Sequence, residues 1–119
     1  MPLKNSIERE LMRGWNLEVN DSGELIIGGC NSIQLGTIYG TPLHLVNEER
    51  LRPTEDVFLG TIKSKYPGDI AVHYAFKCNP VPGIIQVIKK AGLKAEVMSE
   101  YELMLALKLG YSGNEIIVN

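Results

Sequence analysis

His73-Tyr74-Ala75-Phe76-Lys77-Cys78-Asn79-Pro80 decides the fold, because this run is typical of a β-strand that delivers a lysine to its own carboxyl end. Alternation along the strand predicts a small or polar face and a bulky apolar face: Ala71, His73, Ala75 and Lys77 against Ile70, Val72, Tyr74 and Phe76. Parallel α/β sheets place reactive groups at the carboxyl ends of their strands, so Lys77 is a candidate catalytic residue. The alternative is an ordinary solvated lysine at a strand end.

Strand and helix patterns alternate along the rest of the chain, as in a parallel sheet. Helices are expected at 53–65, from Pro82 to Gly92, and from Ser99 to Gly110, and strands at 70–76, 93–98 and 115–118. The expected buried stripes of the three helices are Phe58 and Ile62, then Ile84, Val87, Ile88 and Ala91, then Leu103, Ala106 and Leu107. Ser99 and Glu102 have the spacing of a capping box, which by itself gives Ser99 a complete structural role.

The amino-terminal residues predict a different structure, with antiparallel strands. A short amphipathic helix is expected within 1–14, and 16–19 and 24–27 are expected to form a β-hairpin around an Asn-Asp-Ser-Gly turn. A loop or short helix follows, and 41–46 then predicts a strand with Asn47 as the cap of the next helix. The domain prediction is therefore a leading segment, 1–46, followed by the first βα units, 47–119.

Length and charge limit the possible functions. The chain has 119 residues and a net charge of −2, and a closed eight-unit βα barrel needs roughly 250 residues. Its basic residues are scattered, which argues against a nucleic-acid partner. It has no leader pattern and no long apolar run, so no membrane segment is expected and the cytoplasm is the default location. Cys30 and Cys78 are expected to be free thiols, and no metal site is assigned.

Three segments together resemble a known family: Tyr39-Gly40-Thr41-Pro42-Leu43, the run Tyr74-Ala75-Phe76-Lys77-Cys78-Asn79, and the stretch 95–103. The middle run matches at every position the Tyr-Ala-hydrophobic-Lys-Ala/Cys-Asn pattern of the fold-type III, alanine-racemase-like, pyridoxal-phosphate-dependent amino-acid decarboxylases. The resemblance covers about residues 22–119. The chain departs from the family at Glu96, where many members have Asp, and at Glu100-Tyr101, where they have Gly-Gly.

The resemblance implies an α/β fold in which a leading β-hairpin and strand precede alternating βα units, the first part of a (β/α)8 barrel that this chain is too short to close. In the family the leading segment contributes to a second β-domain. The implied cofactor is pyridoxal 5'-phosphate, with Lys77 as the catalytic Schiff-base lysine. Ala75, Asn79 and Glu96 are the further cofactor-binding candidates, whereas His73 is interpreted as a hydrogen-bonded core residue.

The resemblance implies the amino-terminal part of an amino-acid decarboxylase, inactive alone and homodimeric in its full-length form. Its expected substrate is a small molecule, an amino acid that is diaminopimelate-like or basic. The Tyr-Gly-Thr-Pro segment favours the diaminopimelate branch and Lys77-Cys78-Asn79 the ornithine branch, and the first covers more residues together with the hairpin. Two alternatives stay open: a non-catalytic protein that carries the cofactor, and an α/β module that binds a partner through an open sheet edge.

Overall fold

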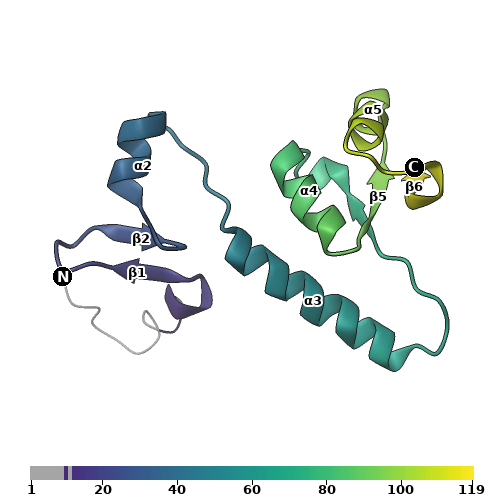
Figure 1. The fold of residues 1–119 in the computed structure, drawn as a ribbon, viewed down its shortest axis with the longest axis horizontal. Helices are drawn as coiled ribbons and strands as arrows, with labels where there is room; N and C mark the ends of the chain where they lie inside the picture. The colour runs from purple at the N-terminus through teal and green to yellow at the C-terminus, as the bar shows by residue number, and fades with distance from the viewer. Residues whose placement is uncertain (1–9, 11) are drawn as a thin grey trace. The chain divides into compact units, whose positions relative to one another are not determined.

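A computed structural model describes residues 10 and 12–119, except for the side chains of 53–56. Contacts divide the chain into two compact units, Met1–Leu51 and Arg52–Asn119, and the ribbon in Figure 1 shows the elements of each. The helix expected within 1–14 falls mostly outside the described residues, although 12–14 are helical. The boundaries and roles predicted for the two domains stay a prediction.

The leading unit is built on a small antiparallel sheet. Strands β1 (Leu17–Val19) and β2 (Leu25–Ile27) form the expected hairpin, and β3 (Cys30–Asn31) adds a third strand in the order β1-β2-β3. The third strand was not expected. It forms because Gly28 and Gly29 both adopt positive φ, which lets a two-residue turn fold the chain back so that Ile27 pairs with Cys30.

One carboxylate joins the hairpin turn to the helix that follows, α2 (Ser32–Tyr39). Oε2 of Glu24 accepts hydrogen bonds from Nδ2 of Asn20 at 2.9 Å and from Nδ2 of Asn31 at 2.7 Å. These bonds favour the charged form and lower the pKa of Glu24. Oδ1 of Asn31 caps α2 by accepting from the backbone N–H groups of Ile33 and Gln34.

The expected strand at 41–46 is wrong, because this segment has no regular structure and Leu43, Leu45 and Val46 are exposed. An extended segment becomes a strand only when a neighbour pairs with its backbone, and no described strand does so here. The alternation of apolar residues is therefore not sufficient to make 41–46 a strand.

The long helix α3 (Glu48–Lys65) begins earlier than expected and contains Pro53 in its interior. Its first turn carries Glu48 and Glu49, which suit the positive end of the helix dipole. The predicted buried stripe is partly wrong: Phe58 is 52% exposed, and Leu59 is the buried residue. Leu59 and Ile62 are three positions apart and therefore lie on the same face of the helix. The inward face of α3 thus contains Leu59 and Ile62, and Phe58 lies outside it.

The second unit is an open parallel sheet in the order β4-β5-β6, formed by β4 (His73–Ala75), β5 (Lys94–Val97) and β6 (Ile116–Val118). Figure 1 traces the connections from green to yellow. They are the 3-10 turn η1 (Phe76–Cys78), helices α4 (Pro82–Lys90) and α5 (Glu100–Lys108), and the short η2 (Gly113–Glu115). The predicted α/β fold with alternating βα units is confirmed, and the described strands do not close into a barrel.

One face of this sheet packs against the helices in an apolar core. The core consists of Phe76, Ile85, Ala95, Val97, Ala106 and Tyr111, with Tyr74 and several leucines packed around it. The rings of Phe76 and Tyr111 meet edge to face at 6.0 Å between centroids. The stripe predicted for α4 is corrected, since Ile85 and Ile88 are buried whereas Ile84 and Val87 are only half-buried.

The helix ends follow the sequence signals, with one correction on α5. Oγ of Ser99 caps α5 by accepting from the N–H of Glu102 at 3.2 Å, and Oε2 of Glu102 accepts from the N–H of Met98 at 2.8 Å. Gly92 and Gly110 end α4 and α5 with positive φ. Leu107, expected on the buried face, is 49% exposed. Across residues 10 and 12–119 no helix combines the length and apolar character of a membrane span.

Candidate cofactor-binding site

The sheet of the second unit leaves one face free of the apolar core. Ala75 pairs in register with Glu96, and Glu96 with Ile117, so these three side chains form a row across β4, β5 and β6 on one face. The neighbouring residues of β5, Ala95 and Val97, are fully buried on the other face. The small and polar face predicted for the His73–Ala75 strand is therefore the face that the described core leaves open.

Lys77 lies directly after β4, at the carboxyl edge of the sheet. The strand is shorter than predicted: it ends at Ala75, and Lys77 belongs to the turn η1. Phe76 is 0% exposed in the core, whereas Lys77 beside it is exposed. Burial of the Phe76 ring therefore anchors the turn and leaves the amine of Lys77 accessible at the strand end.

The other predicted residues surround this turn in different ways. His73 and Ala75 are half-buried on the strand itself. Oδ1 of Asn79 accepts from the N–H of Val81 at 3.2 Å, which shapes the entry to α4. The side-chain hydroxyl group of Tyr74 donates a hydrogen bond to the backbone carbonyl of Asn79 at 3.4 Å. The side chain of Asn79 thus has a local structural role, and its contact with a cofactor stays a prediction.

Glu96 has a partner that sequence reasoning missed. Nδ2 of Asn119 donates to Oε1 of Glu96 at 3.0 Å, and the backbone N–H of Asn119 donates to the carbonyl of Val97 at 2.9 Å. Asn119 extends the alternation of β6 two residues beyond Ile117, so it shares the open face with Glu96. That alternation is the sequence signal that places Asn119 on the face of Glu96.

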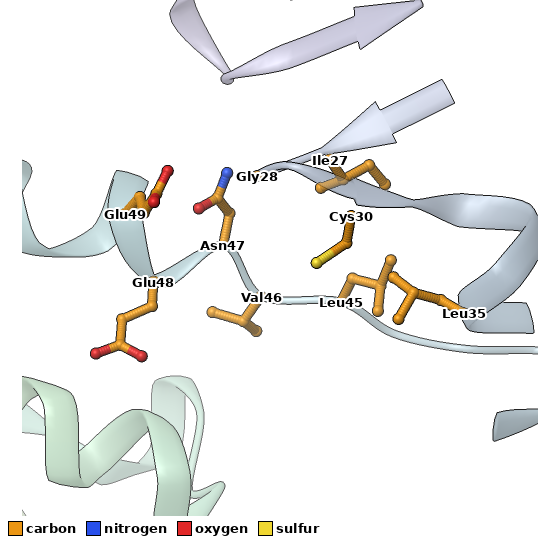
Figure 2. A pocket seen from close by; sticks show the side chains of 9 residues that line it. All are labelled: Ile27, Gly28, Cys30, Leu35, Leu45, Val46, Asn47, Glu48 and Glu49. Atoms are coloured by element: carbon orange, nitrogen blue, oxygen red, sulfur yellow. The ribbon is translucent and has the colours of Figure 1, made fainter. Parts of the chain in front are cut away.

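A separate cavity of about 300 Å³ lies in the leading unit, and none of the predicted site residues lines it. Its wall combines apolar side chains with Cys30, Asn47 and the start of α3. Figure 2 shows Asn47 turned toward Gly28 and Glu48 pointing away from it. Nδ2 of Asn47 is buried and has no hydrogen-bond partner among the described residues. The cavity is only partly enclosed, and among the described residues no group of three or more His, Cys, Asp or Glu side chains could hold a metal ion.

The residues at the edge of the second sheet fit a carbonyl-bearing cofactor. Lys77 offers a primary amine, the group that bonds to an aldehyde, at an accessible turn. Ala75 presents only a methyl group on the neighbouring face, which leaves room for a flat ring, and Glu96 supplies a hydrogen-bond acceptor in the next strand. These features agree with what the sequence predicted for pyridoxal phosphate.

Residues 59–119 match the family described as pyridoxal-dependent decarboxylase, pyridoxal binding domain. This chain belongs to that family. The match begins inside α3 and includes the whole β4-β5-β6 sheet. The predicted family and its cofactor, pyridoxal phosphate, are confirmed.

Curated relatives cover almost all of the chain. Diaminopimelate decarboxylase of Methanothermobacter thermautotrophicus is 30% identical over 102 residues, which are 86% of this chain and 24% of the relative. The corresponding enzyme of Bacillus methanolicus is 36% identical over 105 residues, 83% of this chain and 23% of the relative. The chain therefore spans about a quarter of the length of the curated relatives it matches.

A solved structure agrees with this likeness. The crystal structure of diaminopimelate decarboxylase from M. jannaschii superposes with a TM-score of 0.76 at 27% identity, over 90% of this chain and 25% of that one. The decarboxylase-family chain thus has the fold of the matching part of that structure. The comparisons do not test individual site residues, so Lys77, Ala75, Asn79 and Glu96 remain predictions as cofactor contacts.

Proposed function

We propose that this chain is the cofactor-anchoring, amino-terminal part of a pyridoxal-phosphate-dependent amino-acid decarboxylase, with Lys77 as the covalent anchor. The observation that carries the proposal is the position of Lys77: exposed, in a turn at the carboxyl edge of a parallel sheet, and fixed by the buried Phe76 beside it. The family match and the names of the relatives support it.

Bound pyridoxal phosphate supplies an electron sink that stabilises the carbanion left when the α-carboxylate departs as carbon dioxide. The chain's own residues hold and orient that group. Lys77 provides the amine that bonds to the aldehyde carbon, and the methyl group of Ala75 allows the ring to approach the strand. Asn79 fixes the loop after Lys77 through its bond to the N–H of Val81. Glu96 offers a carboxylate on the same face.

The proposed substrate is a diaminopimelate-like amino acid or a basic amino acid. Three relatives that are 30% identical or more and cover most of this chain are named diaminopimelate decarboxylases. The M. jannaschii enzyme was also solved in co-complex with L-lysine, which is a basic amino acid. We further propose that the complete enzyme is a cytoplasmic homodimer and that this chain alone does not turn over substrate.

Borohydride trapping tests the role of Lys77. When the chain is incubated with pyridoxal phosphate, the Lys77 nitrogen bonds to the aldehyde carbon and the aldehyde oxygen leaves as water. Borohydride then adds a hydride to that carbon, which converts the C=N double bond into a stable C–N single bond. Peptide mapping by mass spectrometry then measures the share of label on each lysine. We expect label to concentrate on the peptide that contains Lys77.

Two variants make this measurement decisive. Lys77→Ala should remove most of the label, whereas Lys108→Ala, which removes an exposed lysine at the end of α5, should leave the Lys77 share unchanged. Label spread evenly over the lysines and unchanged in Lys77→Ala would contradict the anchor role in this chain.

A second candidate function, a partner-binding module, is favoured by one observation. β6 pairs only with β5 among the described strands, and its Val118 is 68% exposed. An open apolar edge is a surface onto which another chain can add a strand. A monodisperse chain that shows no selective labelling in the trapping experiment would support this function instead.

A further inference from the structure

Asn119 makes two hydrogen bonds, one through its backbone and one through its side chain to Glu96, and only the first is needed to extend the sheet. The backbone of Asn119 is already held by its bond to the carbonyl of Val97, so its side chain is not needed to extend the sheet. The side-chain bond is solvent-exposed, and exposed hydrogen bonds contribute little net stability. Its clear effect is on Glu96: the amide fixes the direction of that carboxylate.

The fixed carboxylate keeps most of its capacity to accept hydrogen bonds. An ionised carboxylate has about four acceptor positions, and the described residues use one of them, on Oε1. Oε2 of Glu96 accepts no hydrogen bond from residues 10 and 12–119. An oriented carboxylate with a free oxygen is therefore available on the open face of the sheet.

The register of β4 and β5 determines where the free oxygen of Glu96 lies relative to Lys77. Glu96 lies opposite Ala75 in the neighbouring strand, at a strand spacing of about 4.8 Å. Lys77 follows Ala75 by two residues, in the turn at the same edge. If Lys77 holds the cofactor, the Glu96 carboxylate would lie one strand away from Ala75, at the same carboxyl edge of the sheet as the Lys77 turn.

We propose that Asn119 is a positioning residue, which orients the Glu96 carboxylate so that its free oxygen can accept a hydrogen bond from the N–H of the Lys77 nitrogen when that nitrogen is protonated. The inference rests on the proposed function, because it assumes that Lys77 is the anchor. It adds a residue outside the lysine segment and assigns its action to one named contact. Asn119 acts through Glu96 and does not itself touch the cofactor.

The trapping experiment extends to this pair with four variants: Asn119→Ala, Glu96→Gln, the double variant, and Asn114→Ala as a control that removes an exposed asparagine from η2. Two quantities are measured: the share of label on Lys77, and the visible circular dichroism of bound pyridoxal phosphate before reduction. The second reports how the ring is held and does not change with sheet stability alone. Far-UV circular dichroism confirms that each variant is folded.

We expect Asn119→Ala and Glu96→Gln each to lower the Lys77 share roughly threefold, as the loss of one hydrogen bond implies. Both should weaken the visible dichroism, and Asn114→Ala should change neither quantity. The double variant should lose no more than either single variant, because both changes remove one shared interaction.

The outcomes separate the two proposals. Selective labelling of Lys77 in the parent chain with no change in Asn119→Ala would overturn the positioning role and leave the anchor intact. Additive losses in the double variant would also overturn it, since the two residues would then act independently. Even labelling of all lysines in the parent chain would contradict the anchor role, and the positioning role with it.

Discussion

The two units of the molecule are stabilised in different ways. The second unit has side chains that are completely removed from solvent, Phe76, Ile85 and Val97 among them. In the leading unit no described residue, at 10 or within 12–51, is buried to that degree. Its hairpin depends on a backbone ladder and on the polar contacts of Glu24 with Asn20 and Asn31. An apolar core thus supports the lysine turn, whereas hydrogen bonds support the front segment.

This difference predicts unequal stability. Complete burial of a large apolar side chain contributes about 1.5–3 kcal/mol, whereas a typical hydrogen bond contributes about 0.5–1.5 kcal/mol. A small sheet without a buried core is marginal in water. We therefore expect the leading unit to unfold first, under conditions in which the second unit remains folded.

The largest effect is expected from Phe76→Ala. Removing a fully buried ring beside Lys77 should destabilise the second unit by about 3–5 kcal/mol and disorder the turn that carries the amine. Urea denaturation measures the loss through the shift of the transition midpoint. The matched control is Phe58→Ala, which removes a ring that is half exposed on α3. Equal losses in the two variants would contradict the assigned core.

A smaller effect is expected from Asn31→Ala in the leading unit. This change removes the cap of α2 and one of the two donors to Glu24, and should cost about 1 kcal/mol. Hydrogen exchange at the backbone amides of β2 and α2 measures it. Asn31→Ser keeps an oxygen that can cap the helix but removes the donor to Glu24, so it separates the two roles. Loss of protection in β5 as well would show that the two units do not unfold independently.

The smallest effect is expected from acid. Hydrogen bonds from Asn20 and then Asn31 lower the pKa of Glu24 in the folded state. The corresponding stabilisation is fully present above the ordinary glutamate pKa, about 4.3, and is lost as the pH falls through the lowered value. Amide signals of the hairpin, followed by NMR during an acid titration, should show this loss. Glu24→Gln should remove it.

Glu115 provides the matched comparison for the acid titration. Its pKa is also lowered, by hydrogen bonds from the side chain and backbone of Ser112, but it lies in the second unit. Glu115→Gln should therefore leave the titration of the hairpin unchanged. A hairpin that responds equally to both substitutions would indicate that its acid sensitivity does not come from Glu24.

Local signals predicted most of the second unit. The alternation from His73 to Phe76 predicted which face packs against the helices, and Ser99, Gly92 and Gly110 marked helix ends where the structure has them. These features depend on a few neighbouring residues, which explains why sequence reasoning reached them. The resemblance around Lys77 predicted the family correctly.

The errors concern features that depend on distant residues. The segment 41–46 has the pattern of a strand, but a strand also needs a partner that no local pattern reveals. The burial of Leu59 instead of Phe58 depends on what packs against α3, and the Asn119–Glu96 bond depends on the register of two strands. Helical spacing alone cannot distinguish between adjacent faces of a helix.

The order of the parallel sheet bears on how the chain folds during synthesis. Each strand pairs with the next strand along the chain, and β4 meets β5 through residues about twenty positions apart. These connections are short for a parallel sheet, in which paired strands are always separated by a crossover. As a nascent chain leaves the ribosome, β5 can join β4 once α4 and β5 have both emerged, and β6 can follow after α5 in the same way. The turn that presents Lys77 can therefore be in place before the later segments of a full-length relative have folded.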